Sequence, residues 1–179
     1  MAIHGDSYCG IYCGSCPVLR HGETGRGDGF IACCAGIPKA ELRCGGCKSG
    51  DVYAGCRVCS FRDCAAGRGL ERCADCPDYP CEPYRKWASM KRILPHVAEA
   101  PASLEAIRRD GAEAWAAAQR KRWACPNCGA PFTWYERSCY ACGRSLAKEA
   151  YAMKGLRRLI CRLVLPKVYR EGKARADRP

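Results

Sequence analysis

Eighteen cysteines in 179 residues, and the way they pair along the chain, constrain this sequence more than any other feature. Six pairs have the spacing Cys-x-x-Cys, whereas random placement at this frequency gives about two. Two thiolates three positions apart turn toward one cation through a tight knuckle, and tetrahedral zinc takes two such knuckles. The pairs are Cys13/Cys16, Cys44/Cys47, Cys56/Cys59, Cys73/Cys76, Cys125/Cys128 and Cys139/Cys142. Their excess predicts that metal sites hold the fold together.

Closely spaced cysteines can cross-link a chain through disulfides or through a shared metal ion, and the redox compartment decides which of the two forms. Residues 1–10 contain no basic stretch followed by an apolar run, so no secretory leader is visible. The longest apolar stretch, Leu159 to Leu165, is interrupted by Arg162 and falls far short of the roughly 20 residues that span a bilayer. We therefore expect a cytoplasmic protein whose reduced thiols bind metal. Disulfides are the alternative if a leader has been removed.

The composition favours a small fold held by metals rather than by buried area. Three Phe are present against 19 Gly and 11 Pro, a bias typical of turn-rich structure. We predict a small metal-stabilised irregular α+β fold with four segments. They are a cysteine-rich metal-binding module (residues 1–81), a two-helix segment (82–123), a zinc ribbon (124–146), and a basic amphipathic helix with a tail (147–179).

The ribbon is the most specific signal. Cys125, Cys128, Cys139 and Cys142 form two knuckles around an aromatic stretch that favours strand, which predicts a β-hairpin between them. The glycine after each second cysteine allows a positive φ, so that backbone N–H groups can point at sulfur. Four thiolates fill all the coordination positions of zinc, which indicates a structural site. Rubredoxin-like iron is the alternative metal.

Ligands in the N-terminal module are harder to assign. The candidates are Cys9, Cys13, Cys16, Cys44, Cys47, Cys56, Cys59, Cys64, Cys73, Cys76 and Cys81. Two four-cysteine sites leave three of these over, whereas three sites need a twelfth ligand, for which the candidates are His4, His21, Cys33 and Cys34. We predict that Cys13/Cys16 pair with Cys44/Cys47, and Cys56/Cys59 with Cys73/Cys76. With the ribbon, this gives about three zinc ions per chain. Cys81 is expected to open the following helix, where the helix dipole favours its thiolate.

An iron–sulfur cluster at Cys9, Cys13 and Cys16 is the alternative, because their spacing is that of radical S-adenosylmethionine enzymes. The sequence after them shows no strand–helix alternation, which those enzymes need for their barrel. Other catalytic arrangements lack parts, since the histidines are His4, His21 and His96 and no hydrolase or nucleotide-binding motif is present. We therefore lean toward a protein that is not an enzyme.

The helices in residues 82–123 and the C-terminal helix are predicted from the periodicity of their apolar residues. Trp87 and Trp115 lie on the apolar faces of the two helices in residues 82–123 and are expected to pack them together. The C-terminal helix has an apolar face that Pro166 should end. That face is Leu156, Leu159, Ile160, Leu163 and Val164.

Charge is unevenly distributed. Residues 1–81 hold nine Lys/Arg and nine Asp/Glu, whereas residues 151–179 hold nine Lys/Arg against Glu171 and Asp177, a net of +7. Each zinc with four thiolates adds a net charge of about −2, so the loaded module becomes acidic. The basic C-terminal region is therefore suited to bind a protein partner, nucleic acid or a membrane surface. The alternatives within the chain are that it packs against its own domain or neutralises the charge of the cysteine-rich module.

Four motifs carry a resemblance to a known family. They are Cys9-Gly-Ile-Tyr-Cys13-Gly-Ser-Cys16-Pro, Cys44-Gly-Gly-Cys47, Cys59-Ser-Phe-Arg-Asp-Cys64 and Cys73-Ala-Asp-Cys76-Pro-Asp-Tyr-Pro80-Cys81. With the ribbon that follows Trp123, they resemble the prokaryotic family catalogued as domain of unknown function 3795, over about residues 8–145. The resemblance implies a cytoplasmic, zinc-binding bacterial or archaeal protein with no established activity. Cys33, Cys34 and the tail lie outside the pattern. We expect a non-enzymatic zinc-binding adaptor, with an iron–sulfur or redox protein as the alternative.

Overall fold

The computed structural model describes residues 5–176 and consists of helices, short 3-10 turns and loops. Its α-helices are α1 (Pro17–Thr24), α2 (Ser60–Gly67), α3 (Glu82–Ala88), α4 (Ala100–Asp110), α5 (Ala112–Arg122) and α6 (Gly155–Ala176). The 3-10 turns are η1 (Cys13–Ser15), η2 (Ile31–Cys33), η3 (Lys39–Glu41), η4 (Ala54–Cys56), η5 (Cys73–Asp75), η6 (Ser89–Arg92) and η7 (Pro95–Glu99). Residues 5–176 contain no strand, so the α+β prediction is wrong and the fold is mostly helical.

Cysteines begin the short helices of the N-terminal module. Cys16, Cys59 and Cys81 are the N-cap residues of α1, α2 and α3, each with an extended backbone. At α1, the Cys16 side chain makes no capping hydrogen bond, and burial raises the pKa of its thiol although the N–H groups of Leu19 and Val18 act to lower it. The expectation that Cys81 opens a helix is confirmed.

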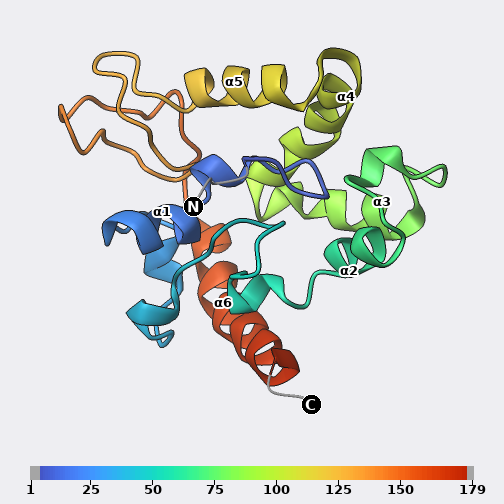
Figure 1. Cartoon of the computed structure of the whole chain (residues 1–179). Coiled ribbons are helices and arrows are strands. Elements are labelled where there is room, and N and C mark those ends of the chain that lie inside the picture. Colours follow the sequence, from blue (N-terminus) through green and yellow to red (C-terminus); the bar gives the residue numbers. More distant parts are fainter. Residues whose placement is uncertain (1–4, 177–179) are drawn as a thin grey trace.

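Three apolar clusters form the core, and α6 joins two of them. The first surrounds the ribbon and includes Cys33 and Cys161, and the second lies in the N-terminal module and includes Tyr169. The third is built by Cys9, Phe61, Ala74, Tyr84 and Leu104, from the N-terminal loop, α2, η5, α3 and α4. In Figure 1, α6 runs from the middle of the molecule down past the blue and teal N-terminal segments. The ribbon and the cysteine-rich module therefore share buried surface.

Helix α6 differs from the prediction in length and in orientation. It continues through Pro166 to Ala176 instead of ending there. Its buried side is Cys161, Tyr169 and Gly172, whereas Leu156 and Leu163 of the predicted apolar face are 72% and 69% exposed. Pro166 lies inside the helix and lacks the N–H group that would continue the intrahelical hydrogen bonds there. No described helix, α6 included, is both long and apolar enough to cross a membrane.

Helix α6 lies against η4 of the module at Gly172. A Cβ atom there would collide with the carbonyl oxygen of Ala54 in η4. Nearby, the rings of Tyr169 and Tyr53 stack with centroids 6.2 Å apart. Glycine is therefore required for the helix to lie against this backbone.

Residues 82–122 contain more helices than predicted. Gly111, with φ of 84°, separates α4 from α5 where one continuous helix was expected. The two tryptophans do not pack the segment together. Trp87 contacts Phe61 at a centroid distance of 5.2 Å, and Trp115 meets Tyr12 edge-on at 5.7 Å. Both therefore attach this segment to the N-terminal module.

Candidate metal centre

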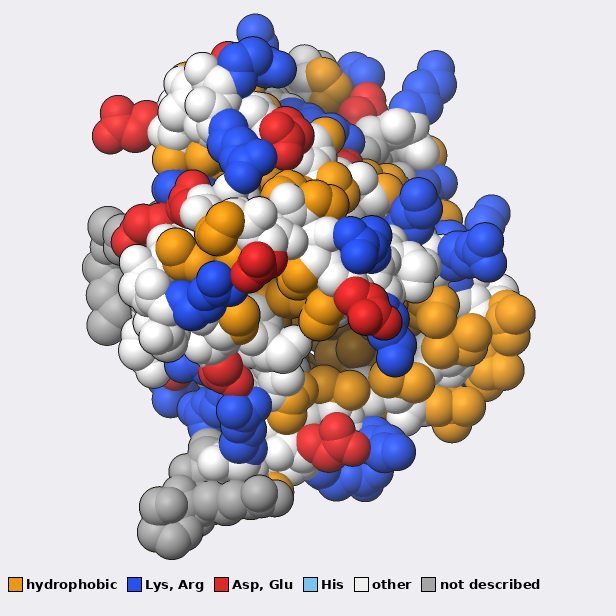
Figure 2. All heavy atoms as spheres, turned by 90° about the vertical axis from the view of Figure 1, so that its right-hand side faces the viewer, with side chains coloured by type: hydrophobic (Ala, Val, Ile, Leu, Met, Phe, Trp, Pro, Cys, Tyr) orange, Lys and Arg blue, Asp and Glu red, His pale blue; other side chains and the backbone are white. Residues whose placement is uncertain are grey.

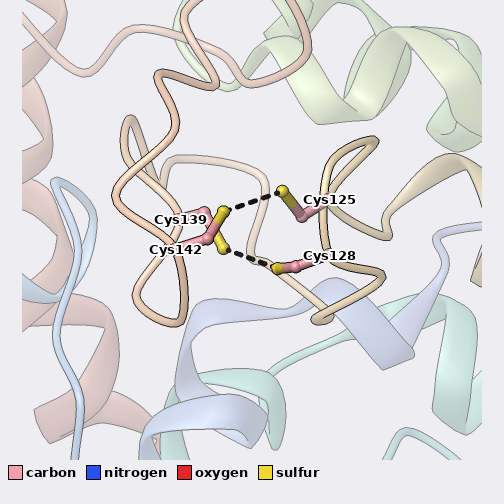
Figure 3. A group of neighbouring side chains, drawn as sticks. All are labelled: Cys125, Cys128, Cys139 and Cys142. Carbon is pink, nitrogen blue, oxygen red and sulfur yellow. Dashed lines mark hydrogen bonds between the residues drawn. The ribbon is translucent and has the colours of Figure 1, made fainter.

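Two short loops bring the ribbon cysteines together. In each loop the glycine after the second cysteine donates its N–H to the carbonyl of the first, Gly129 to Cys125 at 2.8 Å and Gly143 to Cys139 at 2.9 Å. These glycines have φ values of 74° and 73°, which confirms the predicted positive φ. The turns aim all four side chains inward, as Figure 3 shows.

The four sulfurs have the spacing of a metal site. Their atoms all lie within 4.8 Å of one another, with 3.7 Å between Cys125 and Cys142 and 3.5 Å between Cys128 and Cys139. Tetrahedral zinc with Zn–S bonds of about 2.3 Å places its ligand sulfurs about 3.8 Å apart. Cys125 and Cys139 are buried and the other two exposed. This cluster could therefore bind one metal ion with little rearrangement.

One thiol of the cluster has a lowered pKa. The Asn127 side chain and the Arg144 N–H donate hydrogen bonds that lower the pKa of Cys142 to about 6. A thiolate is the form that binds metal, so this lowered pKa favours the binding of a cation. Asn127 was missed by sequence reasoning, although an amide inside a Cys-x-x-Cys loop is a signal that could have identified it.

The predicted β-hairpin is absent from the ribbon. Isolated bridges, Ala124 to Pro131 and Ser138 to Ser145, close the two loops instead. The residues between them bind neighbouring segments: Thr133 donates to the Asp28 carboxylate, and the Trp134 N–H donates to the Ser15 carbonyl at 3.2 Å. Tertiary contacts have replaced the hydrogen bonds that a strand would make.

The N-terminal cysteines are arranged more loosely. Within residues 5–176, the ribbon is the one group of three or more potential ligands with all donor atoms inside 4.8 Å. Several N-terminal sulfurs nevertheless accept backbone N–H groups as metal-bound thiolates do. Cys44 accepts from Gly46 at 3.3 Å and from Tyr53 at 3.4 Å. All eighteen cysteines are free thiols.

Several of these thiols influence one another's pKa. Burial and, to a smaller extent, the neighbouring Cys44 raise the pKa of Cys16 to about 12. Burial and then the nearby Cys16 and Cys47 raise the pKa of Cys13 in the same way. Cys13 and Cys16 therefore lie near Cys47 and Cys44, and Cys56 interacts with Cys16, Cys44 and Cys47. The ligand pairs in this module stay a prediction.

The residues considered as a twelfth ligand have other partners. The Cys33 thiol donates to the Gly29 carbonyl at 3.3 Å, and the Cys34 thiol to the Phe30 carbonyl at 3.6 Å. The His21 Nδ1 lies 2.8 Å from the Arg26 carbonyl oxygen. His4 lies outside the described residues. Cys33, Cys34 and His21 are thus held as parts of the core and of α1.

Residues 6–86 match the family model described as a protein of unknown function, DUF3795. The match covers the cysteine-rich module and most of α3, which bears out the resemblance seen in the motifs, and it ends before the ribbon. The comparisons with curated proteins and with solved structures gave no match.

Proposed function

We propose that this chain, whose residues 6–86 form a DUF3795 domain, is a cytoplasmic zinc-binding adaptor with no catalytic activity of its own. The observation that carries the proposal is the closed ribbon site. Four thiolates leave no coordination position for water or substrate, so a metal there supports structure rather than chemistry. The N-terminal cysteines extend the same role, and their number gives about three zinc ions per chain.

The surface that suits a partner is the outer face of α6. Leu156, Leu159 and Leu163 project from it with exposed fractions of 72%, 56% and 69%, and Val164 lies beside them. Exposed apolar groups gathered over two helical turns are rare on a monomer and mark interaction sites. The opposite side of α6 is buried, so the helix is already formed when a partner arrives.

Charge argues for an acidic protein as that partner. Residues 150–170 contain six Lys/Arg and no Asp/Glu. Within residues 5–176, the exposed Arg158 and Arg162 beside the leucines have no carboxylate partner. A second copy of the chain would bring like charges together. An apolar groove with an acidic rim fits both the leucines and the arginines.

Nucleic acid is less well supported. Lys173 pairs with Glu41 at 2.8 Å and Arg175 with Asp63 at 2.6 Å, so part of the basic region neutralises the cysteine module in cis. On the face that carries α2 and α3, basic and acidic side chains are mixed, and hydrophobic groups gather at one edge (Figure 2). A phosphate backbone needs a continuous basic surface.

Elemental analysis tests the metal role. Protein purified without added metal is expected to carry several zinc ions, to be colourless above 350 nm, and to unfold when chelated. Zero or one zinc per chain contradicts the proposal. Iron with visible absorbance supports the iron–sulfur alternative at Cys9, Cys13 and Cys16 instead.

Affinity capture followed by reconstitution tests the partner role. A captured protein must bind the purified chain directly, and Leu159→Glu/Leu163→Glu should weaken that binding at least about tenfold. Met90→Glu is the matched control, because Met90 is 39% exposed outside α6. Equal loss in both variants, salt-sensitive binding to a DNA duplex as the main activity, or self-association through the leucines contradicts the proposal.

A further inference from the structure

A groove of about 720 Å³ lies between α5 and the N-terminal module. In Figure 1 the blue N-terminal segment, which contributes to this groove, runs beneath α5. The α5 wall contains the small side chains of Ala112 and Ala116, and the other wall contains Asp6, Lys48 and Arg72. A groove of this size accepts a small molecule or a few residues of a peptide. None of the residues that line it belongs to the ribbon or to α6.

Arg72 is held so that part of its guanidinium group stays free. Its Nε and Nη2 donate to the same oxygen of Asp6, at 3.1 and 2.8 Å, whereas its Nη1 has no hydrogen-bond partner among residues 5–176. The side chains of Arg72 and Asp6 are 17% and 13% exposed, so this pair is fixed in a mostly buried setting. An anchored guanidinium presents its remaining N–H groups as a fork that matches a carboxylate.

The α5 wall adds two charged residues, Glu113 and Arg120. Both are exposed, and neither has an ion-pair partner in the part of the chain that the structure describes. They are seven positions apart on α5, which separates their Cα atoms by about 10 Å along the helix axis. Opposite charges at this separation match a ligand that has a negative group at one end and a positive group at the other.

The charges of the lining residues sum to zero. The three cations and three anions are Lys48, Arg72 and Arg120, and Asp6, Glu71 and Glu113. A dianion such as a phosphate monoester would be repelled by the carboxylates, whereas a monoanion needs only the free N–H groups of the two arginines. A carboxylate is therefore a better match than a phosphate.

The length of the groove matches a short peptide. An extended chain advances about 3.3 Å per residue, so three or four residues span the distance between Arg120 and Glu113. We propose that the groove binds the C-terminal end of an extended peptide. Its terminal carboxylate lies on Arg72 and Arg120, and an amino group or basic side chain of the peptide lies beside Glu113.

A peptide library tests this proposal on the full chain as purified. Tetrapeptides that begin with lysine and vary at the other positions are made twice, with a free C-terminal carboxylate and with a C-terminal amide. Members retained by the immobilised chain are identified by mass spectrometry, and their Kd values are measured by calorimetry. Amidation should raise the Kd at least about tenfold, because it removes the charge that the arginines bind.

Arg120→Gln should raise the Kd of a retained peptide by a similar factor, and its exposed position keeps the cost in stability small. Lys121→Gln is the matched control, because it removes the same charge from the next position of α5, outside the groove, and should leave the Kd within about twofold.

Three results would overturn the proposal: no retained peptide, equal binding of the amides, or equal losses in Arg120→Gln and Lys121→Gln. Acetate that binds as tightly as the peptides would show a site for small carboxylates, and it would overturn the assignment to a peptide end.

Discussion

The imidazole of His96 lies flat against the indole of Trp134, with ring centroids 4.0 Å apart and planes 8° apart. Its Nδ1 is 2.7 Å from the Tyr135 hydroxyl. This contact attaches η7 to the ribbon. Burial lowers the pKa of His96 to about 3, so the ring is neutral in the folded chain at physiological pH.

Stability should therefore fall in mild acid. His96 has a pKa of about 3 when folded and about 6.5 when unfolded, so below pH 6.5 protonation favours the unfolded chain. Between pH 7.5 and 5 this costs about 2 kcal/mol. His96→Phe keeps a stacked ring and removes the titration. Urea unfolding at a fixed concentration of free zinc should show that, between pH 7.5 and 5, the free energy of unfolding falls by about 2 kcal/mol more in the wild type than in the variant. Parallel pH profiles would contradict the assignment.

Gly172→Ala should destabilise the chain, although alanine is the better helix former. The added methyl group would collide with the Ala54 carbonyl, and such overpacking costs about 1–3 kcal/mol. Gly67→Ala is the matched control, because a Cβ at Gly67 in α2 meets nothing within 4 Å. Thermal unfolding should rank Gly172→Ala below the wild type and Gly67→Ala at or above it. An unchanged transition for Gly172→Ala would mean that α6 does not pack against η4.

Removal of one ribbon ligand should remove one metal. Cys128 is exposed, so Cys128→Ser sacrifices little packing. We expect loss of one zinc and of at least about 3 kcal/mol of stability, because structural zinc binding is coupled to folding. Cys161→Ser is the control, since this buried thiol lies outside every ligand set and its variant should keep all its zinc. Elemental analysis of both variants decides; equal zinc contents contradict a ribbon site.

Asp6 should contribute more to stability than an exposed carboxylate. Burial alone would raise its pKa, yet Lys48 and Arg72, at 2.9 and 2.8 Å, lower it overall. The pair is therefore stabilising above the unfolded pKa of Asp6, and this contribution is lost as pH falls through the lower folded value. Asp6→Ala leaves Arg72 without its carboxylate and leaves Lys48 with only the exposed Glu71, and should cost about 2 kcal/mol. Asp51→Ala, at an exposed pair with Arg43, should cost less than about 1 kcal/mol.

The sequence predicted that the four ribbon cysteines lie together, because cysteine spacing reports local geometry directly. The turns at Gly129 and Gly143 needed nothing beyond their own loops. The hairpin was wrong because Thr133 and Trp134 bind Asp28 and Ser15, residues more than a hundred positions away. Contacts of that range override strand propensity and cannot be read from a single sequence.

The orientation of α6 was missed for a related reason. Periodicity identifies the side with the most leucine, yet the buried side is defined by a cysteine, a tyrosine and a glycine. Gly172 is buried because the backbone of η4 approaches it, and a count of apolar residues does not register such a contact. The N-terminal ligand pairs stay a prediction, since the interaction of Cys56 with Cys16 and Cys44 depends on chain folding rather than on spacing.

Helix α6 also sets the order in which this chain can mature. The core around Val18 and Leu42 is completed by Tyr169, near the other end of the sequence. A ribosome must therefore release almost the whole polypeptide before that core can close. During synthesis the core that contains Cys34 therefore stays incomplete until the last helix docks, whereas the cluster around Cys9 needs no residue beyond Leu104.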